Sequence, residues 1–216
     1  LRRKDVRFPF PSGMADNLTG QTVVGVRRRA KYLLVDLSNG QVFLSHLGMS
    51  GRYTLITPDE VARLNPNRLG VRQSVYGELT GFDGRHDHME FRFSDGSVPV
   101  YTDPRRFGIA DLFERAEEPI HALLEHLGPE PFEDWNATIA AERMRGKRSA
   151  IKITLLDQRF VVGVGNIYAC EALHRSGIAP TTPSNTLVRS NGQPTKRLER
   201  LVGEVKSVLD AAIAVG

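Results

Sequence analysis

Residues 31–47, KYLLVDLSNGQVFLSHL, place two runs rich in valine, leucine and aromatic side chains on either side of a Ser-Asn-Gly triplet. Side chains of this kind favour β-strands, and a short polar segment with asparagine and glycine between them predicts a tight hairpin turn. The preceding segment 22–28, TVVGVRR, has the same character and predicts another strand. The N-terminal half therefore reads as β-sheet.

A second hairpin is predicted over residues 86–103. The run HDHMEFRF alternates polar and apolar side chains, turns at Ser-Asp-Gly and returns as SVPVYTD, which predicts strands with one buried face. The alternation also predicts that His86 and His88 share one face of the strand. No further metal ligands accompany them, so a contact with phosphate or carboxylate is favoured over a metal site. Residues 57–85 have no clear period and predict a long loop, with a short helix around PDEVARL.

The second half carries helical signals. Asn136, Ser149 and Asn166 are placed as N-caps of three helices, and glycines at 146 and 177 predict helix ends. The last helix, after Pro194, is the clearest, because its apolar residues recur at steps of three and four. They are Leu198, Leu201, Val202, Val205, Val208, Leu209, Ala212 and Ile213. Strands followed by helices predict an α+β fold with two domains.

Composition narrows the class of protein. The 216 residues carry a net charge of +4, and the basic residues are clustered, whereas residues 111–134 hold eight acids against Arg115 alone. Such segregation indicates either one face for a polyanion or ordinary solvated surfaces. The single cysteine, Cys170, excludes an internal disulfide and a cysteine-based zinc site within these residues. Apolar runs such as FVVGV (160–164) are too short to cross a bilayer, and we expect no membrane association.

The segment VVGVGNIYACEA (161–172) superficially matches a dinucleotide-binding turn. Tyr168 occupies the third fingerprint position, where glycine or alanine is needed, and a helical segment precedes it, so this reading is rejected. Two readings stay open. The glycines and the helix start at Asn166 suit an anion such as phosphate, or they form an ordinary corner between helices without a ligand.

Two other residues, Lys31 and Met49, have a structural and a functional interpretation each, and the pair Arg105 and Phe107 has a functional one. Lys31 is either an exposed strand residue or a phosphate clamp able to move a proton. Met49, in HLGMSG, is favoured as a core residue by its motif alone; the alternative is an apolar wedge for a base stack. Phe107, beside Arg105 in YTDPRRFG, suits a loop inserted into a duplex, where the ring separates a base step and the arginine replaces a displaced base.

Seven motifs together resemble the formamidopyrimidine-DNA glycosylase family, whose bacterial members remove oxidised purines such as 8-oxoguanine and formamidopyrimidines. In chain order they are RRRAKYLL, HLGMSG, HDH, YTDPRRFG, LGPEP, IKITLLDQ and VVGVGNIYACEAL. The resemblance implies an N-terminal β-sandwich over residues 1–115, a linker over 116–126 and a helical helix–two-turn–helix domain over 127–216, with double-stranded DNA bound between the domains. The alternatives are an endonuclease VIII-like glycosylase for oxidised pyrimidines and a module that binds damaged DNA without chemistry.

The resemblance also implies residue roles. Met49, Arg105 and Phe107 match the residues that fill the void left by an extruded base, with Arg105 facing the orphaned cytosine. Lys31, His46 and Asn166 match groups that hold phosphates around the flipped nucleotide, and Lys31 matches a proton donor in β-elimination. The remaining matches are His86 and Lys147, which are further DNA contacts, and Lys152, which lies near the damaged base.

Two features of the family have no counterpart in this sequence. Its nucleophile is an N-terminal proline in a segment reading PELPEVE, and its C-terminus carries a four-cysteine zinc finger, whereas the chain begins at Leu1 and holds one cysteine. We therefore expect a fragment of a bifunctional glycosylase and β,δ-lyase, without the nucleophile and without a cofactor of its own. We further expect a monomer in the bacterial cytoplasm, associated with the nucleoid.

Overall fold

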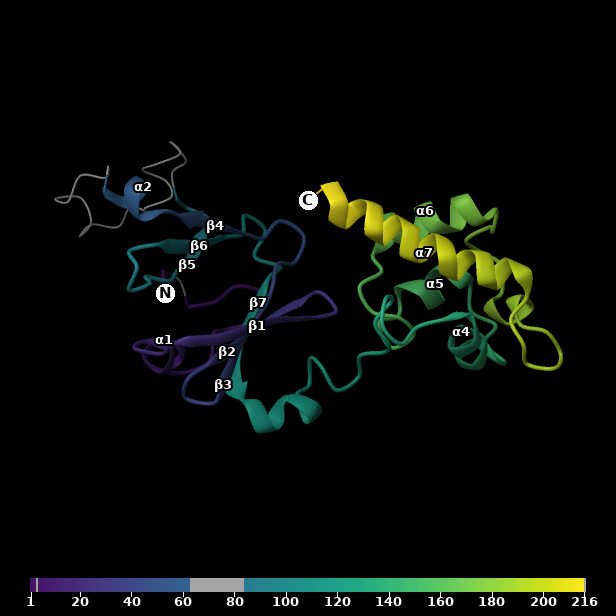
Figure 1. Cartoon of the computed structure of the whole chain (residues 1–216), viewed down its shortest axis with the longest axis horizontal. Coiled ribbons are helices and arrows are strands. Elements are labelled where there is room, and N and C mark those ends of the chain that lie inside the picture. The colour runs from purple at the N-terminus through teal and green to yellow at the C-terminus, as the bar shows by residue number, and fades with distance from the viewer. Residues whose placement is uncertain (3, 63–83, 216) are drawn as a thin grey trace. The chain divides into compact units, whose positions relative to one another are not determined.

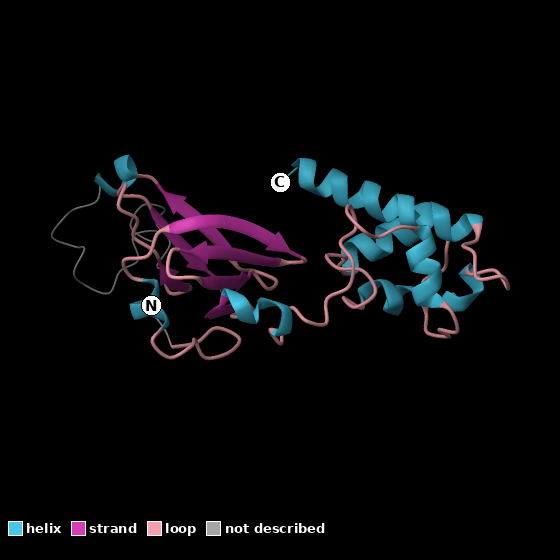
Figure 2. Cartoon of the chain, turned by 60° about the horizontal axis from the view of Figure 1, so that its bottom comes forward, coloured by secondary structure: helices cyan, strands magenta, loops and turns pink. Residues whose placement is uncertain are grey.

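A computed structural model describes residues 1–2, 4–62 and 84–215 of the chain (Figure 1). The chain divides into two compact units, Leu1–Glu117 and Glu118–Gly216. Strands fill the first unit and helices the second (Figure 2). This order confirms the predicted α+β class. The finer division, with a domain ending at 115 and a linker over 116–126, stays a prediction.

The first unit contains two antiparallel sheets. One has the order β1-β2-β3-β7, built from Val23–Arg29, Tyr32–Leu37, Gln41–His46 and Ile109–Glu114. The other has the order β4-β6-β5, built from Arg52–Ile56, Val98–Thr102 and Asp87–Glu90. Two short helices, α1 (Met14–Leu18) and α2 (Pro58–Ala62), accompany them. Both predicted hairpins are present, as is the short helix expected around PDEVARL. The rest of that loop prediction falls largely outside the described residues.

The core of this unit joins the two sheets. Phe43 of the first sheet packs in one apolar cluster with Met89 and Tyr101 of the second, and Met14 of α1 closes the cluster. Each is less than 5% exposed, so the cluster excludes water from between the sheets. This packing is the predicted β-sandwich.

Two strands are additional to those predicted. β4 spans only five residues, and β7 lies in the acidic stretch that begins at Asp111. Neither gives a long alternating pattern. The prediction for His86 and His88 was also wrong, because β5 begins at Asp87 and its register with β6 shifts between Asp87 and Met89. His88 is consequently buried, whereas His86 is exposed in the preceding turn.

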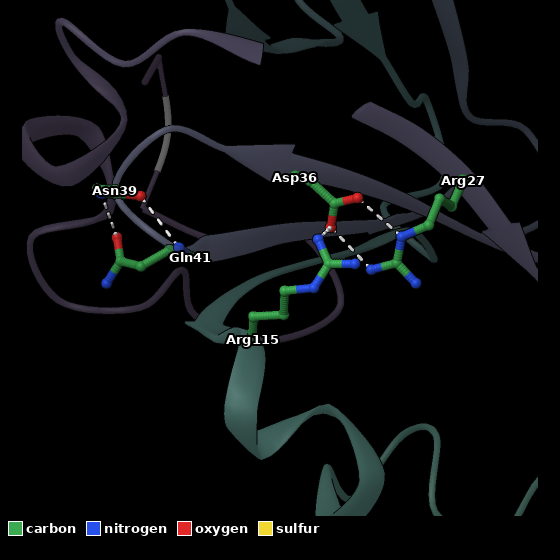
Figure 3. A network of polar contacts seen from close by, with 5 residues as sticks. All are labelled: Arg27, Asp36, Asn39, Gln41 and Arg115. Carbon is green, nitrogen blue, oxygen red and sulfur yellow. Dashed lines mark hydrogen bonds and ion pairs between the residues drawn. The ribbon is translucent and has the colours of Figure 1, made fainter. Parts of the chain in front are cut away.

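A buried carboxylate on β2, Asp36, pairs with an arginine of β1 and with the arginine that follows β7 (Figure 3). Asp36 is 5% exposed, and both of its oxygens accept hydrogen bonds of 2.8 Å from Arg27. Arg115 Nη1 lies 3.2 Å from Asp36 Oδ1. These hydrogen bonds, chiefly those from Arg27, hold the pKa of Asp36 below its ordinary value of 3.8. Because the folded-state pKa is lowered, this stabilisation is complete above pH 3.8 and is lost as the pH falls through the folded pKa.

Replacing Arg27 with alanine should lower the free energy of unfolding by about 1–2 kcal/mol. Breaking a fully buried pair costs about 3–5 kcal/mol, but here Arg115 still pairs with the carboxylate and the Arg27 side chain is 35% exposed. Urea unfolding followed by circular dichroism measures the change. Arg175→Ala is the control, since its ion pair with Glu171 is exposed on α6. Equal losses of unfolding free energy in both variants would contradict a stabilising role for the Arg27–Asp36 pair.

The second unit is helical. Its helices are α4 (Ala137–Met144), α5 (Ile151–Leu156), α6 (Asn166–Ser176) and α7 (Lys196–Val215), with a 3-10 turn at Ser184–Leu187. Another 3-10 turn, Arg115–Ile120, spans the boundary between the two units. Along α7 the predicted apolar stripe is buried from Leu198 to Leu209. Ile213 was predicted to join it but is 71% exposed. In the core of this unit, the buried residues of α7 pack with Trp135, Phe160 and the buried residues of α4 and α6.

The predicted helix caps have mixed outcomes. Asn136 Oδ1 accepts hydrogen bonds of 3.0 Å from the N–H groups of Thr138 and Ile139, which confirms it as the N-cap of α4. Gly177 ends α6 in the left-handed conformation, as predicted. The caps at Ser149 and Asn166 were wrong. The N-cap positions are Ala150 and Gly165, so Asn166 is already the first helical residue, and the Ser149 hydroxyl contacts Thr154 Oγ1 instead.

Within the described residues, no helix has the length and apolar character required to cross a membrane.

Candidate nucleic-acid interface

One end of the first sheet gathers most of the predicted site residues of the first unit. In adjacent strands Tyr32 pairs with His46, and His46 pairs with Ile109. Lys31 directly precedes Tyr32, Met49 follows His46 in the next loop, and Phe107 precedes Ile109 by two residues. Antiparallel pairing thus brings three distant segments of the chain to the same edge.

Lys31 lies in the two-residue turn between β1 and β2, one residue before the strand on which it was predicted. Its neighbour Ala30 has a φ of 54°, a conformation that L-residues rarely adopt, and the Arg28 guanidinium donates to the Ala30 carbonyl at 2.9 Å. Although the Lys31 side chain reaches solvent, partial burial of its amine lowers its pKa. A lowered pKa makes the ammonium a better proton donor near neutral pH.

His46 is held as a neutral ring with a defined proton. Burial, followed by the charges of Lys31 and Arg7, lowers its pKa from 6.5. The Gly48 N–H donates to Nδ1 at 3.0 Å, so the neutral imidazole carries its proton on Nε2. The ring also packs against Tyr32, with centroids 5.1 Å apart. His46 is therefore a fixed N–H donor beside two cations, an arrangement that suits an anion.

Met49 is 72% exposed, so the core reading favoured by its motif was wrong. The loop that carries it is nevertheless tightly packed through its backbone. Gly48 has a φ of 68°, and a Cβ placed there would lie 2.6 Å from the carbonyl carbon of Phe107. The loop at 47–51 therefore rests directly on the loop at 103–108. The exposed Met49 side chain is therefore carried by a loop whose position is fixed by backbone contact at the adjacent residue, Gly48.

Arg105 and Phe107 form a stacked pair on the second loop. The Arg105 guanidinium carbon lies 4.7 Å from the centre of the Phe107 ring, which is 42% exposed. Arg106 between them has a φ of 55° and forms an ion pair of 3.1 Å with Asp5. The left-handed backbone of Arg106 is strained, and its side chain pairs with Asp5 instead of lying beside Arg105 and Phe107. A cation and an aromatic ring thus project together beside an exposed methionine.

His86 lies next to this loop. Its backbone carbonyl accepts a hydrogen bond of 2.9 Å from the N–H of Asp103, and its side chain is exposed. All six predicted site residues of the first unit are therefore connected through the sheet edge or through the loops that leave it.

In the second unit, the loop before α6 is held by one side chain. The Gln158 amide accepts from the Gly163 N–H at 2.9 Å and donates to the Val164 carbonyl at 3.1 Å. Asn166 follows this loop as an exposed residue, and no side chain caps the helix it begins. A helix start without a side-chain cap, after a fixed glycine loop, is suited to an anion. The helix α5 precedes this loop, which agrees with rejecting a dinucleotide-binding turn.

Lys147 and Lys152 lie in neighbouring segments of the second unit. Lys147 Nζ is 5.8 Å from the centre of the Phe160 ring, and the Lys147 carbonyl accepts a hydrogen bond of 2.9 Å from Asn185. Lys152 is half-buried on α5, where its N–H donates to the Pro180 carbonyl. Phe160 directly precedes the loop that leads to Asn166, so Lys147 comes close to that loop. No direct contact among the three predicted residues is found in the described part of this unit.

Two residues that order the site were missed from the sequence. Gln158 and Asp103 sit in turns, where polar side chains are common and carry no distinctive pattern. For Asp103 the only local signal was its position before Pro104 in YTDPRRFG, which suggests a turn and nothing more.

Comparison with known proteins places this architecture in a family. Residues 1–110 match the formamidopyrimidine-DNA glycosylase N-terminal domain, and residues 127–216 match the formamidopyrimidine-DNA glycosylase H2TH domain. The chain belongs to the formamidopyrimidine-DNA glycosylase family. Since both matches are to domains of this enzyme, the endonuclease VIII-like alternative is not favoured.

Individual relatives agree with the assignment. The chain is 43% identical over 220 residues to a formamidopyrimidine-DNA glycosylase of Rhizobium etli, and 46% identical over 217 residues to one of Rhodopseudomonas palustris. Both alignments cover all of this chain and 71% of the relative. Among solved structures, Lactococcus lactis Fpg in complex with DNA containing an abasic site matches with a TM-score of 0.73 and 30% identity. That alignment covers 92% of this chain and 64% of the solved one.

The zinc that the resemblance implies does not fit the residues present. Cys170 is the only cysteine among the 216 residues, whereas the family's finger uses four. The described residues also contain no cluster of three or more histidine, cysteine or acidic side chains able to hold a metal ion. We therefore assign no metal-dependent step to these residues.

Proposed function

We propose that this chain acts in base-excision repair of oxidised purines, as the DNA-recognising part of a glycosylase and β,δ-lyase. The observation that carries the proposal is the convergence of Met49 with the Arg105–Phe107 pair on two loops in backbone contact. Exposed apolar side chains next to an arginine are what a protein needs to separate a base step and fill the space of an extruded base. The solved relative bound to abasic-site DNA supports this choice of ligand.

The neighbouring cations fit the phosphates of the extruded nucleotide. His46 offers an N–H donor, Lys31 an ammonium whose pKa is lowered by burial, and both belong to the same sheet edge. In the family's reaction, β-elimination removes a proton from one sugar carbon and breaks the carbon–oxygen bond at the next, and we assign to Lys31 the transfer of a proton to the departing oxygen. Asn166 and Lys147 add phosphate contacts from the second unit, and Lys152 lies near the damaged base. We further propose that the protein acts as a monomer in the cytoplasm, at the nucleoid.

Replacing Arg105 with alanine should reduce the preference for a lesion opposite cytosine. An arginine paired to a base edge contributes about 1–3 kcal/mol of discrimination, so the ratio of affinities for cytosine over adenine should fall roughly 5- to 150-fold. The measurement is the dissociation constant for duplexes with an abasic-site analogue opposite each base. The matched control is Arg106→Ala, because Arg106 is equally charged but paired with Asp5. Unchanged selectivity in the Arg105 variant would remove its role.

Replacing Lys147 with alanine should weaken binding to damaged and undamaged DNA alike. Loss of one phosphate contact should reduce the slope of log K against log salt concentration by about 0.9. Titrations at several salt concentrations measure this slope, with Lys196→Ala, an exposed lysine at the start of α7, as the control. A loss confined to damaged DNA would show that Lys147 reads the lesion and not the phosphate backbone.

A further inference from the structure

Asp103 is a fully buried charge to which the proposed mechanism assigns no part. It is 0% exposed, and its carboxylate lies where the loop 103–108 meets the loop 47–51. Burying a charge is costly unless hydrogen bonds compensate it. Its partners therefore indicate what the residue is for.

The two carboxylate oxygens bind both loops. Oδ1 accepts from the Ser50 hydroxyl at 2.6 Å and from the Arg105 N–H at 3.3 Å. Oδ2 accepts from the Gly108 N–H at 2.8 Å and from the Tyr101 hydroxyl at 3.2 Å. Ser50 adjoins Met49, while Arg105 and Gly108 bracket the Phe107 segment. One side chain thus ties the residue next to Met49 to both ends of the segment that carries Arg105 and Phe107.

The backbone of Asp103 extends the same network. Its N–H donates to the His86 carbonyl at 2.9 Å, and its own carbonyl accepts from the Arg106 N–H at 3.2 Å and lies 2.8 Å from His88 Nε2. Burial raises the pKa of the carboxyl, but the hydrogen bonds outweigh that effect and hold the pKa below 3.8. The group is therefore an anion at neutral pH, and hydrogen bonds to an anion are the stronger kind.

We propose that Asp103 is a positioning residue that holds Met49, Arg105 and Phe107 as one unit, so that the three side chains enter a damaged duplex together. This inference rests on the proposed function, because it takes those three residues as the groups that fill the void. Asp103 itself is buried and touches no DNA, but through these three residues it determines how well the protein distinguishes a damaged site from intact duplex.

The first test needs no DNA. Ser50→Ala removes one link between the loops, and Asp103→Asn keeps the shape of the side chain but turns an N–H group toward one of its donors. Both should speed amide hydrogen exchange in residues 105–108 by roughly tenfold, the equivalent of about 1.4 kcal/mol. The matched control is Asp95→Asn, whose carboxylate accepts from the Ser97 N–H and hydroxyl in a separate turn. Unchanged exchange in Ser50→Ala, with the fold intact, would overturn the proposal even if Asp103→Asn failed to fold.

The second test separates positioning from stability. The ratio of dissociation constants for undamaged and abasic-site duplexes should fall by about tenfold in Ser50→Ala and stay unchanged in Asp95→Asn. A residue that merely stabilised the fold would leave this ratio intact in the folded protein. Faster exchange with an unchanged ratio would therefore overturn the positioning role. If the parent chain itself showed no preference for damage, the proposed function would fail, and the exchange result would still decide whether Asp103 couples the loops.

Discussion

Replacing Trp135 with alanine is expected to lower the free energy of unfolding of the helical unit by about 3–5 kcal/mol. The side chain is 1% exposed and meets the Phe160 ring edge-on, with centroids 6.0 Å apart and an interplanar angle of 84°. The Lys147 ammonium lies over the ring of Phe160. In the sequence, Phe160 directly precedes the loop that leads to Asn166. The cavity left by the tryptophan would therefore loosen the segment that we expect to contact phosphate.

Trp135→Phe sharpens this test. The indole Nε1 is buried and has no hydrogen-bond partner among the residues that the structure describes, which is unfavourable for a polar group. Phenylalanine keeps most of the ring and removes that N–H, so it should cost much less than alanine. Denaturant unfolding followed by far-ultraviolet circular dichroism measures both variants, with Phe132→Ala, a 42% exposed residue, as the control. A loss of under about 1 kcal/mol for Trp135→Ala would contradict the central place of this residue in the core.

Replacing Gly48 with alanine is expected to disrupt the contact between the loop at 47–51 and the loop at 103–108. A left-handed conformation costs an alanine about 1–2 kcal/mol, and forcing a Cβ against packed backbone adds about 1–3 kcal/mol. The new atom would meet the Phe107 carbonyl carbon at 2.6 Å and the Gly108 nitrogen at 2.7 Å, and backbone atoms cannot rotate away as a side chain can. Binding to an abasic-site duplex should fall at least about tenfold, since the loops must separate.

Gly40→Ala isolates the part of this effect that comes from the clash. Gly40 has a φ of 84° in the hairpin turn between β2 and β3, but a Cβ there would meet nothing within 4 Å. The Gly40→Ala variant should therefore lose stability through backbone strain alone and retain its affinity for damaged DNA. Equal losses of affinity from both variants would show that the contact between the loops is not what matters.

The sequence predicted those parts of the fold that have a strong local pattern. The hairpin at 31–46 follows from apolar runs around Ser-Asn-Gly, and the buried stripe of α7 follows from its spacing. The strand β7 lacked such a pattern because its residues are mixed in character and only partly buried. Asn166 misled the cap assignment because the extended residue before the helix is Gly165, one position earlier.

The site was predictable as a set of candidates but not as an arrangement. Motif resemblance named Lys31, Met49 and Arg105, whereas their grouping depends on strand register and on two loops far apart in sequence. Met49 is exposed on a loop whose backbone contacts the loop at 103–108, an arrangement that no spacing rule reveals. Asp103 was undetectable for a similar reason, since four donors converge on it only in the folded chain.

The most direct test of the proposed function is competitive binding of this 216-residue chain to two duplexes that differ at one position. One carries an abasic-site analogue opposite cytosine and the other an intact guanine–cytosine pair, with circular dichroism confirming that the chain is folded. We predict at least about tenfold tighter binding to the damaged duplex, and loss of that preference in the Arg105→Ala variant. Equal affinity of the folded chain for both duplexes would contradict the proposal that these loops recognise an extruded base.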